Sequence, residues 1–216
     1  MSRKTLFLSV AGLVLVGFVG ATVLFQNYKE TLQGASAVKN QGVVERAGAP
    51  VKGATDARVT IVEFLDPACG TCRDFYPLVK QLIDRYPGKV RLMVRYAPLH
   101  TGSDQVVKML EAAHQQGKFW QALELLFDSQ HRWVISHVSQ PMRARGILNG
   151  MAMDHAKLMA DMNSPAIAGI VQQDVQDGQT LKVRATPEFF VNGRPLPSFG
   201  YDQLRRLVSE AVDKAY

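Results

Sequence analysis

The chain alternates between short runs of apolar, mostly β-branched residues and longer stretches in which apolar residues recur every three or four positions. Two apolar runs, 59–65 and 90–96, have the length and composition of buried strands. The stretch between them, 69–86, carries an apolar stripe at helical spacing and is followed by Pro87 and Gly88, which end helices. These segments predict a β-α-β unit with parallel strands and a right-handed crossover.

Helical periodicity dominates the following part of the chain, from about 101 to 180. The clearest amphipathic stretches are 103–116, 118–130 and 165–177, and a weaker pattern within 140–163 predicts one or two short helices. This part is therefore expected to form a block of helices.

The pattern then returns to strands. The segments 188–192 and 194–197 flank Asn192-Gly193, which is the strongest short-range signal for a hairpin. Residues 201–215 form a last amphipathic stretch. The element order is β-α-β, a helical block, then β-β-α, which predicts an α/β domain over 58–216.

The N-terminal part has a different pattern. Residues 5–25 form an uncharged apolar run that, at ~1.5 Å per residue, spans a bilayer core of ~30 Å. Arg3 and Lys4 precede it, so residues 1–4 are expected in the cytoplasm and the remainder of the chain outside. The alternative is a cleaved signal peptide, although the apolar run is longer than usual. Either interpretation exports the domain to a compartment where disulfides persist.

Residues 26–57 are rich in small residues and have little hydrophobic periodicity, so they are expected to be a flexible linker. Its later part could add a short edge strand, at 43–44 or 49–51. Residues 1–55 carry six Lys/Arg and two Asp/Glu, whereas residues 56–216 carry nineteen and seventeen. Because the domain itself is nearly balanced in charge, nucleic acid is not an expected partner.

Candidate chemistry is concentrated at Cys69 and Cys72, the only two cysteines in the sequence. They lie where the first predicted strand gives way to a helix, with Gly70 and Thr71 between them. A sulfur at a helix N-terminus faces free backbone N–H groups and the positive end of the helix dipole, which favour the thiolate. A purely structural disulfide closing so short a loop would add little stability. The five histidines show no ligand spacing, so no metal site is expected.

The chain resembles the thioredoxin superfamily, and specifically the DsbA-like thiol–disulfide oxidoreductases. The resemblance rests on the strand–Cys-x-x-Cys–helix at 59–86, on Glu63 six positions before the first cysteine, on the segment 183–193, and on similarities to the family's helical insert at 115–120 and 125–127. It implies a thioredoxin-like α/β fold with an inserted helical domain at about 101–180, preceded here by one N-terminal transmembrane helix.

The resemblance also implies roles for individual residues. Cys69 is the expected nucleophile and Cys72 the resolving thiol, and Glu63 is the expected buried acid that accepts the proton of Cys72. Thr186 and Pro187 are expected to form a cis-proline loop that faces the dithiol and pairs with the extended chain of a substrate. No organic cofactor or metal is implied, because the redox-active group is the Cys69–Cys72 disulfide itself.

The residues between the cysteines leave the redox direction open. Gly70-Thr71 matches neither the Pro-His pair frequent in the family's oxidants nor the Gly-Pro pair of thioredoxins. Asp66, Arg73 and Asp74 flank the site, and either tune the thiolate or are solvated surface charges.

The expected function is exchange of disulfides with exported cysteine-containing proteins, together with a membrane redox partner. The expected location is the bacterial inner membrane, with a single span and the catalytic domain in the periplasm; cleavage of the signal would give a soluble periplasmic protein instead. The alternative function is a non-catalytic binding or assembly module, similar to a chaperone, in which the disulfide is inert.

Overall fold

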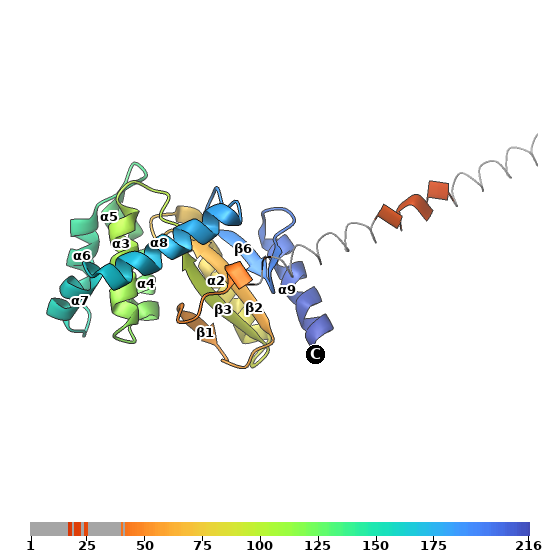
Figure 1. Cartoon of the computed structure of the whole chain (residues 1–216), viewed down its shortest axis with the longest axis horizontal. Coiled ribbons are helices and arrows are strands. Elements are labelled where there is room, and N and C mark those ends of the chain that lie inside the picture. The colour runs from red at the N-terminus through yellow and green to blue at the C-terminus, as the bar shows by residue number, and fades with distance from the viewer. Residues whose placement is uncertain (1–16, 19, 23, 26–39, 41) are drawn as a thin grey trace, which may run out of the picture.

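A computed structural model describes residues 17–18, 20–22, 24–25, 40 and 42–216 of the 216-residue chain. Its centre is a five-stranded sheet with the strand order β1-β3-β2-β6-β7 (Figure 1). The strands are β1 (Val51–Gly53), β2 (Val59–Leu65), β3 (Val90–Tyr96), β6 (Glu188–Val191) and β7 (Arg194–Pro195).

The central strand β2 is buried along its whole length. It pairs in parallel with β3 over seven residues, from Val59 opposite Val90 to Leu65 opposite Tyr96, and antiparallel with β6 on its other side. A strand that is covered on both faces is expected to be a continuous apolar run, and the sequence of β2 has that character apart from Thr60 and Glu63. The predicted parallel β-α-β unit is confirmed.

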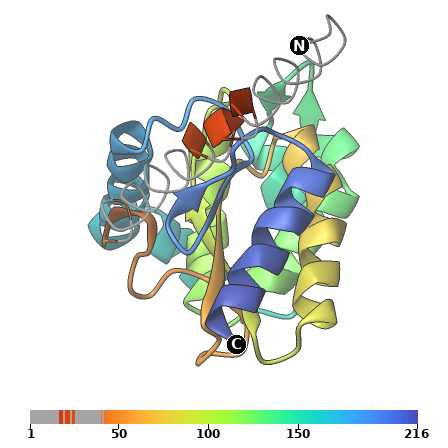
Figure 2. The same ribbon diagram turned by 90° about the vertical axis from the view of Figure 1, so that its right-hand side faces the viewer.

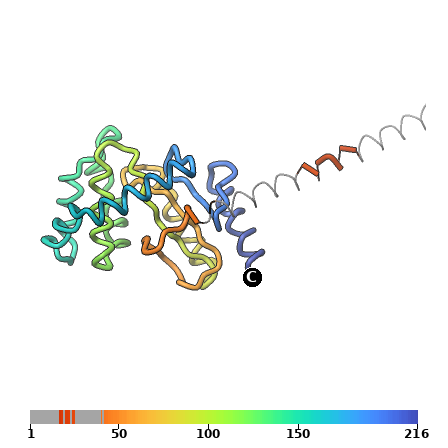
Figure 3. Tube along the Cα trace, viewed as in Figure 1, coloured from red at the N-terminus to blue at the C-terminus, as the bar shows by residue number. Residues whose placement is uncertain are grey.

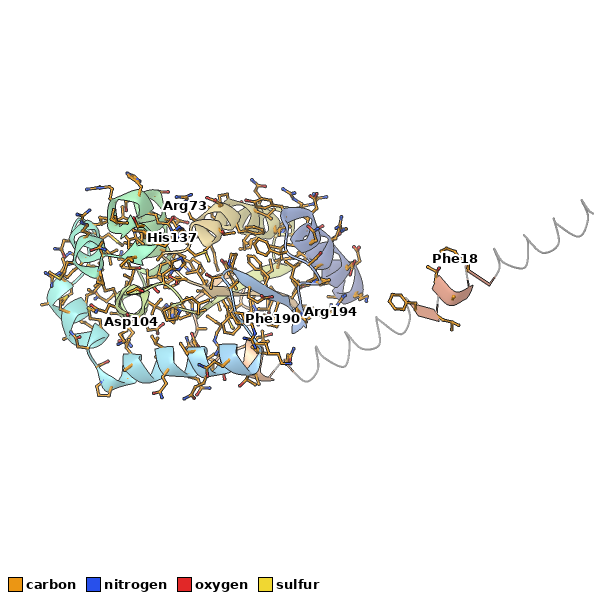
Figure 4. The ribbon with its side chains drawn as sticks, turned by 90° about the horizontal axis from the view of Figure 1, so that it is seen from above. Phe18, Arg73, Asp104, His137, Phe190 and Arg194 are labelled. Atoms are coloured by element: carbon orange, nitrogen blue, oxygen red, sulfur yellow. The ribbon has the colours of Figure 1, made fainter. Side chains whose placement is uncertain are left out.

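The hairpin of β6 and β7, in which Figure 4 labels Phe190 and Arg194, turns at Asn192 and Gly193. Both turn residues have positive φ, 47° and 77°, which is the backbone geometry that favours an Asn-Gly pair in a two-residue hairpin. The hairpin prediction is therefore correct.

Two helices, α2 (Gly70–Arg85) and α9 (Tyr201–Ala215), cover one face of the sheet and lie side by side in Figure 2. The apolar residues of α2 pack with those of β2 and α9 in one large core. This core contains both cysteines, so the dithiol belongs to the main core of the domain.

The helical block lies between β3 and β6 and occupies residues 103–180. It consists of α3 (Ser103–His114), α4 (Phe119–Asp128), α5 (Gln130–Trp133), α6 (Pro141–Leu148), α7 (His155–Met162) and α8 (Pro165–Thr180). Figure 3 shows α8 as a long segment that leads from this block back towards β6. A small hairpin, β4 (Val134–Ile135) with β5 (Val138–Ser139), was not predicted, because its turn residues Ser136 and His137 adopt positive φ without a Gly or Asn signal.

The folded part of the chain begins before residue 58. The strand β1, within the segment expected to be a linker, pairs antiparallel with β3, and Val44 is fully buried in a second apolar cluster on the other face of the sheet. Arg46 forms an ion pair with the buried Asp174 of α8 (2.7 Å). Of the two positions considered for an edge strand, 43–44 is helical, and the observed strand overlaps 49–51 only at Val51. Residues 43–57 nevertheless belong to the domain.

The expected membrane anchor, residues 5–25, falls mostly outside the described residues, as does most of 26–41. Within the part of the chain that is described, no helix has both the length and the apolar character needed to cross a bilayer.

Candidate functional site

The two cysteines lie at the N-terminus of α2. Cys69 is the N-cap residue, has extended backbone angles, and donates its backbone N–H to the carbonyl of Asp66 (3.0 Å). Cys72 lies in the first turn of the helix. Both thiols are unbonded, and the exposed fraction is 7% for Cys69 and 0% for Cys72. The first sulfur is therefore at the surface edge of the core and the second is beneath it.

The thiol of Cys69 is strongly acidified. The pKa of Cys69 is lowered from 9.0 to about 5, chiefly because the Cys72 thiol donates a hydrogen bond to its sulfur. Burial acts in the opposite direction, but a hydrogen bond with Thr186 and the backbone N–H groups of Cys72 and Thr71 lower the pKa further. Since these backbone groups belong to the unpaired first turn of α2, the ionised sulfur takes the place of a capping side chain.

The second thiol is affected in the opposite direction. Burial, followed by its hydrogen bond to Cys69, raises the pKa of Cys72 well above its ordinary value, and the charge of Glu63 raises it further. Cys69 is thus the more acidic thiol of the two, which gives a thiolate at Cys69 and a neutral thiol at Cys72 near neutral pH.

Glu63 lies in the middle of β2, on the same face as Ile61 and Leu65 and therefore on the side of the dithiol. Its side chain is completely buried, and neither carboxyl oxygen has a hydrogen-bond partner in the described part of the chain. Burial, together with the negative charge of Cys69, raises the pKa of Glu63 to about 8. A buried, unpaired carboxyl is unfavourable in most proteins, and it is suited to holding or moving a proton.

The loop before β6 faces the first cysteine. The Thr186–Pro187 peptide bond is cis, as predicted from the sequence. The thiol of Cys69 donates a hydrogen bond to the carbonyl oxygen of Thr186 (3.1 Å). The structure therefore brings the cysteine motif and this distant loop together at the Cys69 sulfur.

The two residues between the cysteines have different environments: Gly70 is partly buried and Thr71 is exposed. A methyl group on Gly70 would come within 3.9 Å of the side-chain oxygen of Gln130, so the insertion lies directly against this turn.

Asp66 is a buried scaffold residue and not a solvated surface charge. Its carboxylate accepts hydrogen bonds from the backbone N–H groups of Ala68, Leu99 and His100, at 2.7–2.9 Å, and from the hydroxyl of Ser103 (3.0 Å). It joins the loop before α2 to the loop before α3. In contrast, Arg73 and Asp74 form an exposed ion pair with each other (2.8 Å).

Gln130 is a site residue that the sequence did not reveal. It lies in α5 and donates hydrogen bonds from its side-chain amide to the carbonyl oxygens of Pro67 (2.9 Å) and Cys69 (3.0 Å). A side chain that contacts backbone more than sixty positions away leaves no local pattern in a sequence. Figure 4 labels Arg73 of α2 and His137 of the β4–β5 turn on this side of the molecule, where α2 meets the insertion.

Exposed apolar side chains occur on two segments that contact elements next to the dithiol. Phe75 of α2 stacks on Tyr201 (4.2 Å between ring centroids) and lies against Phe199, and both of these aromatic residues are exposed. Leu99, whose backbone N–H is held by Asp66, is also exposed.

Within the described residues, no group of three or more His, Cys, Asp or Glu side chains is arranged to hold a metal ion.

A family model described as Thioredoxin matches residues 45–210 of the chain. A crystal structure of a thioredoxin-like oxidoreductase from Silicibacter pomeroyi superposes with a TM-score of 0.68 at 29% identity, covering 81% of this chain and 97% of that one.

Two curated relatives differ in how much of their length the chain matches. Disulfide bond formation protein D of Bacillus subtilis is 27% identical over 201 residues, which is 85% of each protein. The Na(+)/H(+) antiporter NhaA of Herminiimonas arsenicoxydans is 31% identical over 146 residues, but the match spans only 22% of the antiporter. The chain therefore covers about a fifth of the antiporter relatives that it matches.

Proposed function

The chain belongs to the thioredoxin family, and from this membership we propose that it is a DsbA-like thiol–disulfide oxidoreductase that works through its Cys69–Cys72 dithiol. The observation that carries the proposal is the pair of opposite acidities at one helix N-terminus: the pKa of Cys69 is about 5, whereas that of Cys72 is raised. A difference in pKa between the two cysteines has no use in an inert disulfide. It suits an acidic nucleophile at Cys69 and a neutral resolving thiol at Cys72.

We propose that the protein oxidises its substrates. A substrate thiolate attacks the Cys69 sulfur of the Cys69–Cys72 disulfide, so that a mixed disulfide forms and Cys72 leaves. A second substrate thiolate attacks the substrate sulfur of the mixed disulfide and releases Cys69 as a thiolate. The substrate loses two electrons, which the dithiol gains. The low pKa of Cys69 makes it a good leaving group and stabilises the reduced enzyme, and both effects favour this direction.

Glu63 serves as the proton store for Cys72. Burial is the larger cause of its raised pKa and persists when Cys69 is in a disulfide, so its carboxyl can hold a proton and give it to Cys72 as this sulfur leaves the disulfide. In the reverse step the carboxylate takes the proton back. The absence of any other partner for Glu63 among the described residues leaves its carboxyl free for this role.

The Thr186–Pro187 loop serves as the facing wall of the site. The Thr186 backbone lies beside the reactive sulfur, where it can pair with the extended chain around a substrate cysteine. The exposed Phe199, Tyr201 and Leu99 supply apolar contacts for such a chain. The substrates proposed are therefore exported, cysteine-containing polypeptides.

The proposed location is the bacterial inner membrane, with the domain in the periplasm. It is supported by the apolar run 5–25, which follows two basic residues. Each turnover leaves the dithiol reduced, so a second redox protein in the membrane is proposed to reoxidise it. The electrons are held by the two sulfurs, and no further cofactor is required.

The decisive experiment is equilibration of the purified domain with glutathione buffers, followed by quantification of its dithiol. We expect a potential closer to the ~−120 mV of a strong oxidant than to the ~−270 mV of thioredoxin. A value at or below that of thioredoxin would overturn the oxidising direction.

A second measurement tests the enzyme itself. At pH 6, Cys69 of the reduced protein should react with an alkylating agent several-fold faster than a free peptide cysteine, because most of it is already ionised. Reaction no faster than that of the peptide would support an inert binding module instead.

A further inference from the structure

We infer that Gln130, in the helical insertion, is a positioning residue for the dithiol and makes the protein a stronger oxidant. The inference rests on the dithiol chemistry proposed above. It concerns a residue in a different layer of the fold, which touches neither sulfur directly.

The loop that leads into α2 is held from two sides. Its backbone donors are taken by Asp66, whose carboxylate accepts from Ala68 N–H (2.9 Å) and whose carbonyl accepts from Cys69 N–H (3.0 Å). Its carbonyl acceptors at Pro67 and Cys69 are taken by Gln130. Asp66, directly after β2, and the Gln130 side chain of the insertion thus satisfy complementary groups of the same loop.

The Gln130 amide uses both of its N–H bonds for this purpose, one for each carbonyl, at 2.9 and 3.0 Å. The residue is 5% exposed, so little water can replace these bonds. Only one further backbone contact reaches the Cys69 carbonyl among the described residues, the longer helical bond from Arg73 N–H (3.3 Å). Loss of the amide would remove the Gln130 bond from both carbonyls and leave the Cys69 carbonyl with only the longer helical bond, so the loop would be freer to shift.

The position of the Cys69 backbone determines the environment of its sulfur. The sulfur ionises readily chiefly because the Cys72 thiol hydrogen-bonds to it, and further because it lies within reach of the Thr186 side chain and of the backbone N–H groups of Cys72 and Thr71. All of these contacts depend on the orientation of the Cys69 peptide unit, which Gln130 fixes through the carbonyl. Gln130 therefore acts on the thiolate through the backbone.

The two redox states depend on Gln130 to different extents. In the oxidised protein the sulfur–sulfur bond itself ties Cys69 to α2. In the reduced protein only non-covalent contacts hold the thiolate in place. Gln130 should consequently stabilise the reduced state more than the oxidised state, which corresponds to a more oxidising protein.

The test is the Gln130→Met variant, which keeps the length of the side chain and removes both donors. We expect the pKa of Cys69, followed by the ultraviolet absorbance of the thiolate, to rise by about one unit, and the equilibrium with glutathione to move about tenfold, or about 30 mV, towards the less oxidising side. If this variant does not fold, Gln130→Glu keeps the size of the side chain and also lacks the amide donors, and the same direction is expected.

The matched control is Gln116→Met. Gln116 also bridges backbone with its amide, donating to the Asp154 carbonyl (3.0 Å) and accepting from Asp154 N–H (2.9 Å), but it does so within the insertion and away from the dithiol. This variant should leave the pKa of Cys69 and the glutathione equilibrium unchanged.

A purely structural role of Gln130 would lower the stability of both redox states equally and leave the glutathione equilibrium where it was. That result, or an equal shift in the Gln116 variant, would overturn the inference. Failure of the wild-type protein to exchange with glutathione at all would instead count against the proposed function, so the two can be told apart.

Discussion

The sulfur of Cys69 donates a hydrogen bond to the carbonyl oxygen of Thr186, at 3.1 Å, although the two residues are 117 positions apart in the sequence. A thiol can make this bond and a thiolate cannot, since the ionised sulfur has no proton to donate. On ionisation the sulfur must therefore rely on the donors around it, which include the first turn of α2 and Thr186. The Thr186 loop thus touches the reactive atom in both protonation states.

A Thr186→Val variant tests the contribution of this loop to the thiolate. Besides the carbonyl contact, a hydrogen bond with the Thr186 side chain is among the causes that lower the pKa of Cys69 to about 5. Loss of the hydroxyl should therefore raise that pKa, by up to about one unit. The measurement is a pH titration of thiolate absorbance in the reduced protein. Thr71→Val is the control, because Thr71 acts through its backbone N–H, which valine retains. Equal shifts in both variants would contradict the assignment.

A Cys72→Ser variant should trap substrates. Cys69 can still attack a substrate disulfide and form a mixed disulfide, but no resolving thiol remains to release the substrate from it. We expect covalent complexes with exported proteins, visible on non-reducing gels and identified by mass spectrometry after reduction. Cys69→Ser should give none, because Cys72 is completely buried and its thiol is not acidic. Complexes of equal abundance in the two variants would show that the roles of the cysteines are wrongly assigned.

The strands and helices nearest the dithiol could be predicted because their signals are local. The β2 run, the stripe of α2 and the Asn192-Gly193 turn are each complete within a few residues. The contact between Cys69 and the Thr186-Pro187 loop joins residues far apart in the sequence, so no local pattern predicts it. It was expected only from the resemblance to a known family.

The features that the sequence did not predict depend on contacts between residues that are far apart in the sequence. Residues 43–57 have a linker-like composition, yet they fold onto the domain because β1 pairs with β3 and Arg46 meets Asp174. Likewise, neither Asp66 nor Gln130 differs locally from a surface polar residue. Their roles follow from backbone groups that only the folded chain brings within reach.

The buried acid should make stability depend on pH in a characteristic way. The pKa of Glu63 is about 8 in the folded protein and 4.5 as a free side chain, so between these values the folded state holds a proton that the unfolded state has lost. The free energy of unfolding therefore falls as the pH rises through this window. Glu63→Gln cannot titrate, and its advantage over the wild type should grow by about 3 kcal/mol between pH 4.5 and 7.5.

The measurement is denaturant unfolding of the reduced protein at several pH values, because the charge of Cys69 that helps to raise the pKa of Glu63 is absent from the disulfide form. Both proteins keep the two cysteines, so the difference between their unfolding curves reports on Glu63. Glu124→Gln is the control of opposite sign. Burial raises the pKa of Glu124, but Tyr76 and two lysines outweigh it, so the net pKa is lowered and the carboxylate stabilises the fold above its unfolded pKa. Parallel curves for wild type and Glu63→Gln would refute the buried-proton account.

The last prediction concerns the buried ion pairs of Asp174, which hold the segment 43–57 on the domain through Arg46. Asp174 has no exposed surface, and its carboxylate accepts hydrogen bonds from Arg95 (2.7 Å), Arg46 (2.7 Å) and the backbone of Tyr96 (2.9 Å). Replacing one member of a buried ion pair leaves the other charge uncompensated, which typically costs 3–5 kcal/mol. Asp174→Asn keeps the shape and removes the charge, so we expect a loss of about that size in denaturant unfolding.

The neighbouring Asp177→Asn is the matched control. Asp177 also pairs with Arg95, but it is partly exposed, and its loss leaves Arg95 with Asp174, so a smaller effect is expected. A second readout separates local release from general destabilisation. Arg46 is shielded by its bond to Asp174, and without that bond trypsin should cleave after Arg46 in the native protein before it cleaves elsewhere in the domain. Equal losses in the two variants, or no early cleavage at Arg46, would mean that Asp174 does not fasten this segment.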